Sequence, residues 1–150
     1  MNKKSEEAYI SLFKYLDENI FKLNAATFMT DYETAMRNAL KLIYPNSKLY
    51  GCWFHFCQAV RRHLIIQKRS VLLPFIRNNK NASLIYHKLL ALPLLPAKSI
   101  PVMFEALKLQ AQTFDSEKLF NKFFNYYEKQ WIQKVHKNII TIFLQIIIKL

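Results

Sequence analysis

Three side chains that can take part in chemistry lie at the ends of two short apolar segments. Asp31 follows the first segment, residues 25–29, whereas Cys52 ends the second, residues 49–52, and His55 comes three positions later. A carboxylate can bind a divalent cation, and Cys-x-x-His has the spacing of half a zinc site. In open α/β sheets, ligands bind at the carboxyl ends of the strands. Asp31, Cys52 and His55 are therefore the candidates for a site.

The residues around these candidates predict a strand, a helix and a second strand. Residues 25–30 and 48–53 have the length and apolar character of buried strands. The helix over residues 31–44 has one small and apolar face, formed by Ala35, Ala39, Leu42 and Ile43. A helical crossover of this length, roughly a dozen residues, permits a parallel βαβ unit.

Helices are predicted on both sides of the βαβ unit. Ser5 can cap the first of them, with Glu6 and Glu7 in its first turn. The apolar face of this helix consists of Tyr9, Leu12, Phe13, Leu16 and Ile20. Beyond Trp53 the spacing indicates a helix broken at Pro74, one capped by Asn81 that reaches Leu92, one from Ser99 to about Phe114, and one beginning at Asp115 or Ser116. The predicted fold class is α/β and mostly helical.

The last predicted helix carries aromatic residues at helical spacing. These are Phe120, Phe123, Phe124, Tyr127 and Trp131. Aromatic side chains can stack on nucleic-acid bases, but this periodicity favours a buried helical face.

The composition indicates one domain with a real core, because the chain has 150 residues and is 52% hydrophobic. One glycine and five prolines argue against an all-β sandwich or barrel, which needs many turn residues. The net charge is +12, and no Asp or Glu occurs between Thr34 and Phe104. This distribution favours a polyanionic partner, either nucleic acid or an anionic membrane surface. The alternative is a solvated basic surface without a partner.

The ends of the chain predict an intracellular protein, nuclear or cytoplasmic and not secreted. The N-terminus lacks the apolar core and cleavage site of a signal peptide. The isoleucine-rich segment 139–148 is shorter than the roughly 20 residues that a membrane span needs. Two cysteines are too few for a disulfide framework.

One family is resembled by the whole central block. Its residues are Thr30-Asp31-Tyr32-Glu33, then Ala35 and Ala39, Tyr44-Pro45, and finally Gly51-Cys52-Trp53-Phe54-His55-Phe56-Cys57-Gln58-Ala59. This block resembles the central part of the Mutator-like element (MULE) transposases, which are DDE-type enzymes on an RNase H-like fold. The resemblance extends through residues 89–96 to Trp131, and so covers most of residues 5–135.

The resemblance implies both a fold and a site. The fold would be partly RNase H-like over about residues 5–60, with a helical insertion over about 61–135 and a divergent apolar tail, 136–150. Asp31 would be the second acid of the catalytic triad and a ligand of Mg²⁺ in the ancestral enzyme. Cys52 and His55 would form a signature beside the active site.

Each candidate also has a structural interpretation. Asp31 can cap a helix beginning at Tyr32, and Glu33 can complement the helix dipole from the surface. A zinc site that adds Cys57 or His63 is disfavoured, because Cys57 would point away from His55 on a helix. Cys52 can be a buried thiol, and His55 can either contact a DNA phosphate or form local hydrogen bonds. A further set, Arg61, Arg62, Lys68 and Arg69, can bind the DNA backbone or form a solvated face.

The chain departs from the family in its number of acids. We expect the first and third catalytic acids to be missing, so we expect a transposase fragment that is inactive alone and needs no cofactor in isolation. Its partners would be DNA and the missing transposase segments or another copy of the chain. The alternatives are a non-catalytic DNA-binding or protein-interaction module derived from a transposase, and a helical protein at an anionic membrane.

Overall fold

The computed structural model describes residues 5–66 and 71–135. It divides into two compact units, Met1–Cys52 and Trp53–Leu150, and each is described by itself. The predicted tail, 136–150, and two of the basic candidates, Lys68 and Arg69, lie outside the described residues. Among the described helices, none combines the length and the apolar character that crossing a membrane requires.

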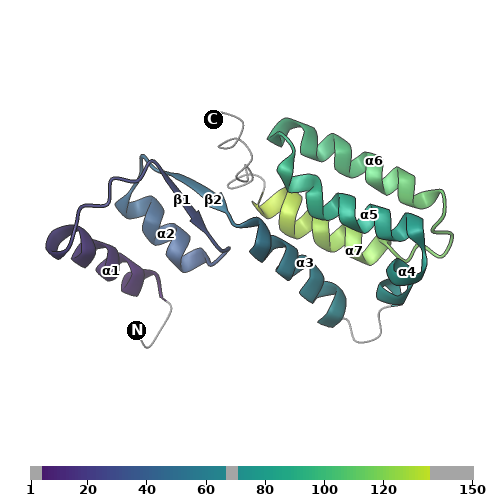
Figure 1. The fold of residues 1–150 in the computed structure, drawn as a ribbon, viewed down its shortest axis with the longest axis horizontal. Coiled ribbons are helices and arrows are strands. Elements are labelled where there is room, and N and C mark those ends of the chain that lie inside the picture. Colours follow the sequence, from purple (N-terminus) through teal and green to yellow (C-terminus); the bar gives the residue numbers. More distant parts are fainter. Residues whose placement is uncertain (1–4, 67–70, 136–150) are drawn as a thin grey trace. The chain divides into compact units, whose positions relative to one another are not determined.

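The first unit contains a parallel βαβ arrangement preceded by a helix (Figure 1). Its elements are α1 (Glu6–Asn19), β1 (Thr27–Thr30), α2 (Thr34–Ile43) and β2 (Lys48–Gly51). β1 and β2 pair in parallel, from Thr27 opposite Lys48 to Thr30 opposite Gly51. The predicted strand order and parallel direction are therefore confirmed, with strands a few residues shorter than predicted.

Helix α1 begins as predicted but buries only part of its apolar face. The Ser5 hydroxyl accepts a hydrogen bond from the Ala8 backbone N–H at 3.3 Å, which satisfies one of the free donors of the first turn. Tyr9 is 7% exposed, whereas Leu12 and Ile20 are 40% and 61% exposed. The prediction for Leu12 and Ile20 was wrong, because α1 packs mainly on α2 and one helix covers only a narrow stripe of its neighbour.

Helix α2 starts three residues later than predicted and buries Ala39 of the predicted face but not Leu42. Its buried residues are Arg37, Ala39 and Leu40, whereas Leu42 is 63% exposed. The prediction that Leu42 is buried was therefore wrong. A hydropathy pattern places arginine on the surface. Here the guanidinium of Arg37 is instead turned towards the strand ends.

The second unit is helical. Its elements are α3 (Trp53–Ile66), α4 (Leu72–Asn78), α5 (Lys80–Ala91), the short 3₁₀ helices η1 (Leu92–Leu94) and η2 (Ala97–Ser99), α6 (Ile100–Gln112), α7 (Asn121–Tyr127) and the π-helical η3 (Glu128–Val135). α5, α6 and α7 lie side by side in Figure 1. The predicted helical region is thus confirmed, with different boundaries.

Two predicted helix boundaries were wrong. Pro74 lies inside the first turn of α4, where its missing N–H costs nothing, so α3 ends before this proline and not at it. Asn79, not Asn81, caps α5: its side-chain oxygen accepts from the backbone N–H groups of Asn81 and Ala82 at 2.9 and 3.1 Å. The chain offers two asparagines two positions apart, and the one that follows the end of α4 becomes the cap.

The aromatic residues of the last helices form the core, as their spacing predicted. Phe120, Phe123 and Tyr127 are at most 2% exposed, and the rings of Trp131 and Phe56 lie 4.8 Å apart in an edge-to-face arrangement. The Tyr127 hydroxyl donates to a backbone carbonyl of α5 at 2.8 Å, so its one polar group is satisfied. These rings are therefore not available for stacking on bases.

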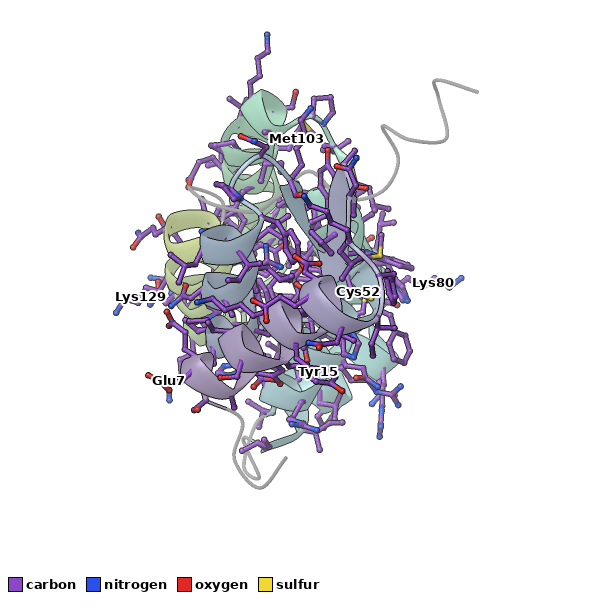
Figure 2. All side chains as sticks on the ribbon, turned by 90° about the vertical axis from the view of Figure 1, so that its left-hand side faces the viewer. Glu7, Tyr15, Cys52, Lys80, Met103 and Lys129 are labelled. Atoms are coloured by element: carbon purple, nitrogen blue, oxygen red, sulfur yellow. The ribbon has the colours of Figure 1, made fainter. Side chains whose placement is uncertain are left out.

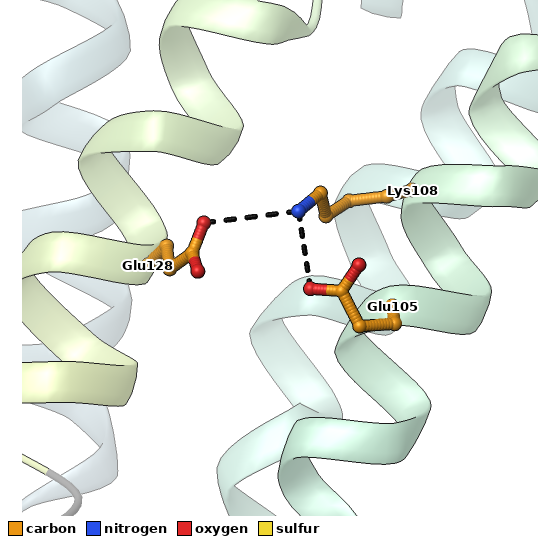
Figure 3. A network of polar contacts seen from close by, with 3 residues as sticks. All are labelled: Glu105, Lys108 and Glu128. Atoms are coloured by element: carbon orange, nitrogen blue, oxygen red, sulfur yellow. Dashed lines mark hydrogen bonds and ion pairs between the residues drawn. The ribbon is translucent and has the colours of Figure 1, made fainter.

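A turn, and not a helix, follows α6. Both Asp115 carboxylate oxygens accept backbone N–H groups, from Leu119 at 2.8 Å and from Phe120 at 2.9 Å, and Lys118 has a positive φ of 55°. The predicted start at residue 115 or 116 was therefore too early, because Asp115 holds a tight turn ahead of α7. Within α6, Lys108 lies 3.0 Å from Glu105 and 3.7 Å from Glu128 of η3, a partly exposed ion-pair network (Figure 3).

Candidate functional site

Asp31 directly follows β1, at the carboxyl end of the parallel pair. The Cys52 backbone N–H donates to the Thr30 carbonyl at 2.8 Å, so the pairing continues to the residue before Asp31. Asp31 is half-buried, and its Oδ1 accepts the Glu33 backbone N–H at 3.0 Å. No other hydrogen bond to this carboxylate is found within residues 5–66 and 71–135, so Oδ2 stays available.

The hydrogen bond of Asp31 corrects the predicted cap. α2 begins at Thr34 with Glu33 as its N-cap residue, and the Asp31 carboxylate closes a turn one step earlier. Side chains of Asp commonly bond the backbone two residues on in this way. Asp31 therefore fixes the loop between β1 and α2, and it does so with one oxygen.

Glu33 also differs from its predicted surface role. Its Oε2 accepts a hydrogen bond from the Tyr9 hydroxyl at 3.1 Å, which connects the start of α2 to α1. Burial raises the pKa of Tyr9, and the hydrogen bond to Glu33 and the negative charges of Glu33 and Asp31 act in the same direction. The Tyr9 hydroxyl therefore stays a neutral donor, and Glu33 is a half-buried structural carboxylate.

Arg37 is a buried residue at this site that the sequence did not identify. It is 4% exposed, and its guanidinium donates to the Thr30 hydroxyl at 2.6 Å and to the Tyr50 carbonyl at 3.2 Å. Longer contacts reach the carbonyls of Asp31 at 3.3 Å and Leu49 at 3.5 Å. One cation thus connects the carboxyl ends of β1 and β2.

Burying the charged Arg37 guanidinium has a free-energy cost. It lowers the pKa of Arg37, and the nearby Tyr32 and Asp31 side chains oppose that shift. The Arg37 Nε is buried without a hydrogen-bond partner among the described residues. The burial of Arg37 could have been inferred from its spacing. Leu40 and Tyr44, three and seven positions later, share its helical face and are buried.

The one glycine of the chain lies beside the same loop. A Cβ atom at Gly51 would meet the Tyr32 ring, with 2.6 Å to Cε1 and to Cζ. Real Cβ atoms do not come this close to other atoms, so the ring requires glycine at this point. Gly51 lets the Tyr32 side chain, next to Asp31 in the chain, lie against the end of β2.

Cys52 and His55 lie at the end of one unit and the start of the other. Cys52 is half-buried with a free thiol. His55 is in the first turn of α3, exposed, with its ring edge-on to Phe54 at 5.6 Å. Two further zinc-ligand candidates are farther along α3: Cys57 is half-buried, and His63 stacks on the Tyr126 ring at 3.5 Å, where burial lowers its pKa.

The described side chains do not by themselves fit a two-metal centre. Within residues 5–66 and 71–135, no three His, Cys, Asp or Glu side chains come together as a metal-binding group. Asp31 offers one oxygen after its bond to the Glu33 N–H, and Glu33 is engaged by Tyr9. A two-metal site needs several carboxylates around the ions, so other acids would have to be supplied.

Two of the basic candidates and two further cations are exposed on the helical unit. Arg61 and Arg62 lie on α3 and Arg77 lies on α4, each exposed and without an acidic partner in the described part of the chain. Lys80, at the start of α5, extends from the ribbon into solvent (Figure 2). These cations are free to bind an anion.

Comparison with known proteins found one family that matches the first part of the chain. The model of the MULE transposase domain matches residues 1–59, whereas no curated protein and no solved structure matches. The matched residues contain the complete βαβ unit, Asp31, Cys52 and His55. The resemblance of residues 60–135 stays a prediction. Residues 1–59 thus match the MULE transposase domain, which supports a protein derived from a MULE transposase.

Proposed function

We propose that the first unit is part of an RNase H-like domain and presents Asp31 as one acid of a DDE-type centre. The observation that carries this proposal is the position of Asp31, immediately after β1 in a parallel βαβ unit and with one carboxylate oxygen unused. Strand ends of this kind are where α/β proteins place their chemistry. The ancestral function would be metal-dependent cleavage and transfer of DNA strands.

We further propose that this chain does not cleave DNA alone. One carboxylate cannot hold two Mg²⁺ ions, so the remaining acids would come from other transposase segments or from another copy. Asp31 would bind Mg²⁺ through its free oxygen in such an assembly. Arg37 and Tyr32 would hold the loop between β1 and α2, and with it Asp31, in place.

A nicking assay tests this proposal. Supercoiled DNA is incubated with Mg²⁺ and either the wild-type chain or Asp31→Asn, a variant whose amide oxygen can still accept the Glu33 N–H and so preserves the turn. We expect no nicking above background from either protein. Mg²⁺-dependent nicking by the wild type that Asp31→Asn abolishes would show an autonomous enzyme and refute the proposal.

A second function, binding of the DNA backbone, is supported by the unpaired cations of the helical unit. Arg61, Arg62 and Arg77 are exposed without acidic partners among the described residues, and no acidic residue occurs between Thr34 and Phe104. Three phosphate contacts would lower duplex affinity about 40-fold between about 50 and 200 mM salt, through counterion release. This would be sequence-independent binding.

The salt dependence of binding separates this function from a bare basic surface. The double variant Arg61→Gln/Arg62→Gln should reduce the slope of log affinity against log salt by about two. Lys14→Gln is the matched control, an exposed cation on α1 of the other unit. An affinity that does not change with salt would exclude backbone binding.

A further inference from the structure

A cavity of about 510 Å³ lies between α3, α4 and α5 of the helical unit. Arg61 of α3 and Arg77 of α4 line it, together with Ser83 and Tyr86 of α5, and no carboxylate is among the described residues that line it. Ligand pockets are commonly of about this size, 300–1,000 Å³, and combine apolar walls with a few polar groups. The lack of acids makes this cavity suited to an anion.

The two arginines and the Tyr86 hydroxyl supply the cavity with hydrogen-bond donors. Burial raises the pKa of Tyr86, the positive charge of Arg61 opposes that rise, and Cys57 adds to it. Because burial is the largest effect, the Tyr86 hydroxyl stays protonated near the Arg61 guanidinium. Neither Arg61 nor Arg77 has an acidic partner in residues 5–66 and 71–135, so both guanidinium groups can receive an oxyanion.

An exposed aromatic ring completes the lining. Phe54 is 61% exposed although it lines the cavity, whereas Phe56, two positions on, is fully buried in the core. Trp53 fixes this end of α3, because its indole N–H donates to the Leu90 carbonyl of α5 at 2.8 Å. An exposed ring and two arginines that line the same cavity are the combination that binds single-stranded nucleic acids, with bases on aromatic faces and phosphates on cations.

We propose that this cavity binds one unpaired nucleotide of single-stranded nucleic acid, with its phosphate between Arg61 and Arg77 and its base against Phe54. A base-paired duplex keeps its bases inside the helix, so it could use the arginines but not the ring. The inference rests on the proposed nucleic-acid binding of this unit and adds the class of ligand. DNA and RNA share this chemistry, and the experiment distinguishes them.

The test compares single strands with a duplex by fluorescence anisotropy on the full chain. Labelled oligo(dT), oligo(U) and a duplex of equal charge are the probes. Phe54→Leu, which keeps an apolar side chain without an aromatic face, should weaken the tighter single strand on the order of tenfold and leave the duplex unchanged. Phe54→Tyr restores the ring and should restore the affinity.

Arginine variants test where the phosphate binds. Arg61→Gln and Arg77→Gln should each weaken single-strand binding more than Arg62→Gln, a neighbour of Arg61 that does not line the cavity. All three should weaken duplex binding equally. The order of affinities for oligo(dT) and oligo(U) shows which nucleic acid fits, and binding of either one through Phe54 supports the proposal.

Three results would overturn the inference, and each points to a different failure. If Phe54→Leu binds both single strands as wild type does, the cavity does not bind a base, although salt-dependent duplex binding would still hold. If no probe binds, backbone binding fails as well. Equal losses from Arg61→Gln and Arg62→Gln on single strands would also reject the cavity.

Discussion

Removal of the Arg37 guanidinium should destabilise the first unit more than any surface substitution on the same helix. The Arg37 Nη1 contacts three acceptors, the Thr30 hydroxyl and the carbonyls of Tyr50 and Asp31, but has only two hydrogens to donate. We therefore count two good bonds, the ones at 2.6 and 3.2 Å. At about 1.5 kcal/mol for a bond from a charged donor, Arg37→Ala should cost about 3 kcal/mol.

A second variant separates the bonds from the volume of the side chain. Arg37→Met keeps most of the volume and removes both the buried charge and the unpartnered Nε. Replacing a buried charge by an apolar side chain can recover part of the loss. We expect Arg37→Met to lose about 1–2 kcal/mol, through the strand-end carbonyls that no longer have a donor.

Urea unfolding and hydrogen exchange measure the effect in the right unit. Both tryptophans, Trp53 and Trp131, belong to the helical unit, so their fluorescence is an internal control, and far-UV circular dichroism with exchange of residues 27–52 reports on the βαβ unit. Lys41→Met, an exposed position on α2, is the matched variant. A loss below about 1 kcal/mol for Arg37→Ala, or one equal to that of Lys41→Met, would refute the reasoning.

Three further predictions concern single contacts. Gly51→Ala should cost about 1–3 kcal/mol in urea unfolding because its Cβ meets the Tyr32 ring, and should cost less in a Tyr32→Ala background; an equal cost in both would contradict this contact. Burial, the hydrogen bond to Asp17 and the charge of that carboxylate raise the pKa of Tyr44 to about 12. Stability from Tyr44 should therefore be complete below about pH 10 and be lost as the pH rises through about 12, which ultraviolet titration of wild type against Tyr44→Phe checks. Asp115→Ala removes both acceptors of the turn before α7 and should cost about 2 kcal/mol in thermal melts, with exposed Ser116→Ala as the control that should melt like the wild type.

The βαβ unit could be predicted from the sequence because its signals are local. Two apolar segments and the helical face between them placed both strands and α2 within about three residues of their observed bounds. The start of α2 was missed, because the Asp31 side chain closes a turn that delays the helix to Thr34. Caps depend on where the preceding element ends, which also explains why Asn79 and not Asn81 caps α5.

Arg37 shows why the rest could not be predicted. Its spacing to Leu40 and Tyr44 places it on the buried face of α2, but an arginine is buried only where hydrogen-bond acceptors are present for its guanidinium. Those acceptors are backbone carbonyls at the ends of β1 and β2, and they come together only when the strands have paired. The hydropathy of one helix contains no information about them.

Several polar side chains of the first unit make hydrogen bonds around one loop. In the first unit, Arg37, Glu33 and Tyr9 are turned inward and their bonds surround the loop that carries Asp31. A buried charge with an unpaired Nε is expensive to maintain, and an apolar residue of similar size would often be as stable. An apolar residue could not hold the carboxyl ends of two four-residue strands in one position. The Asp31 carboxylate follows one of these ends. The Arg37 network is therefore better explained by the need to fix the geometry of the strand ends than by a gain in stability. A carboxylate that is to bind a ligand has to be held in one position.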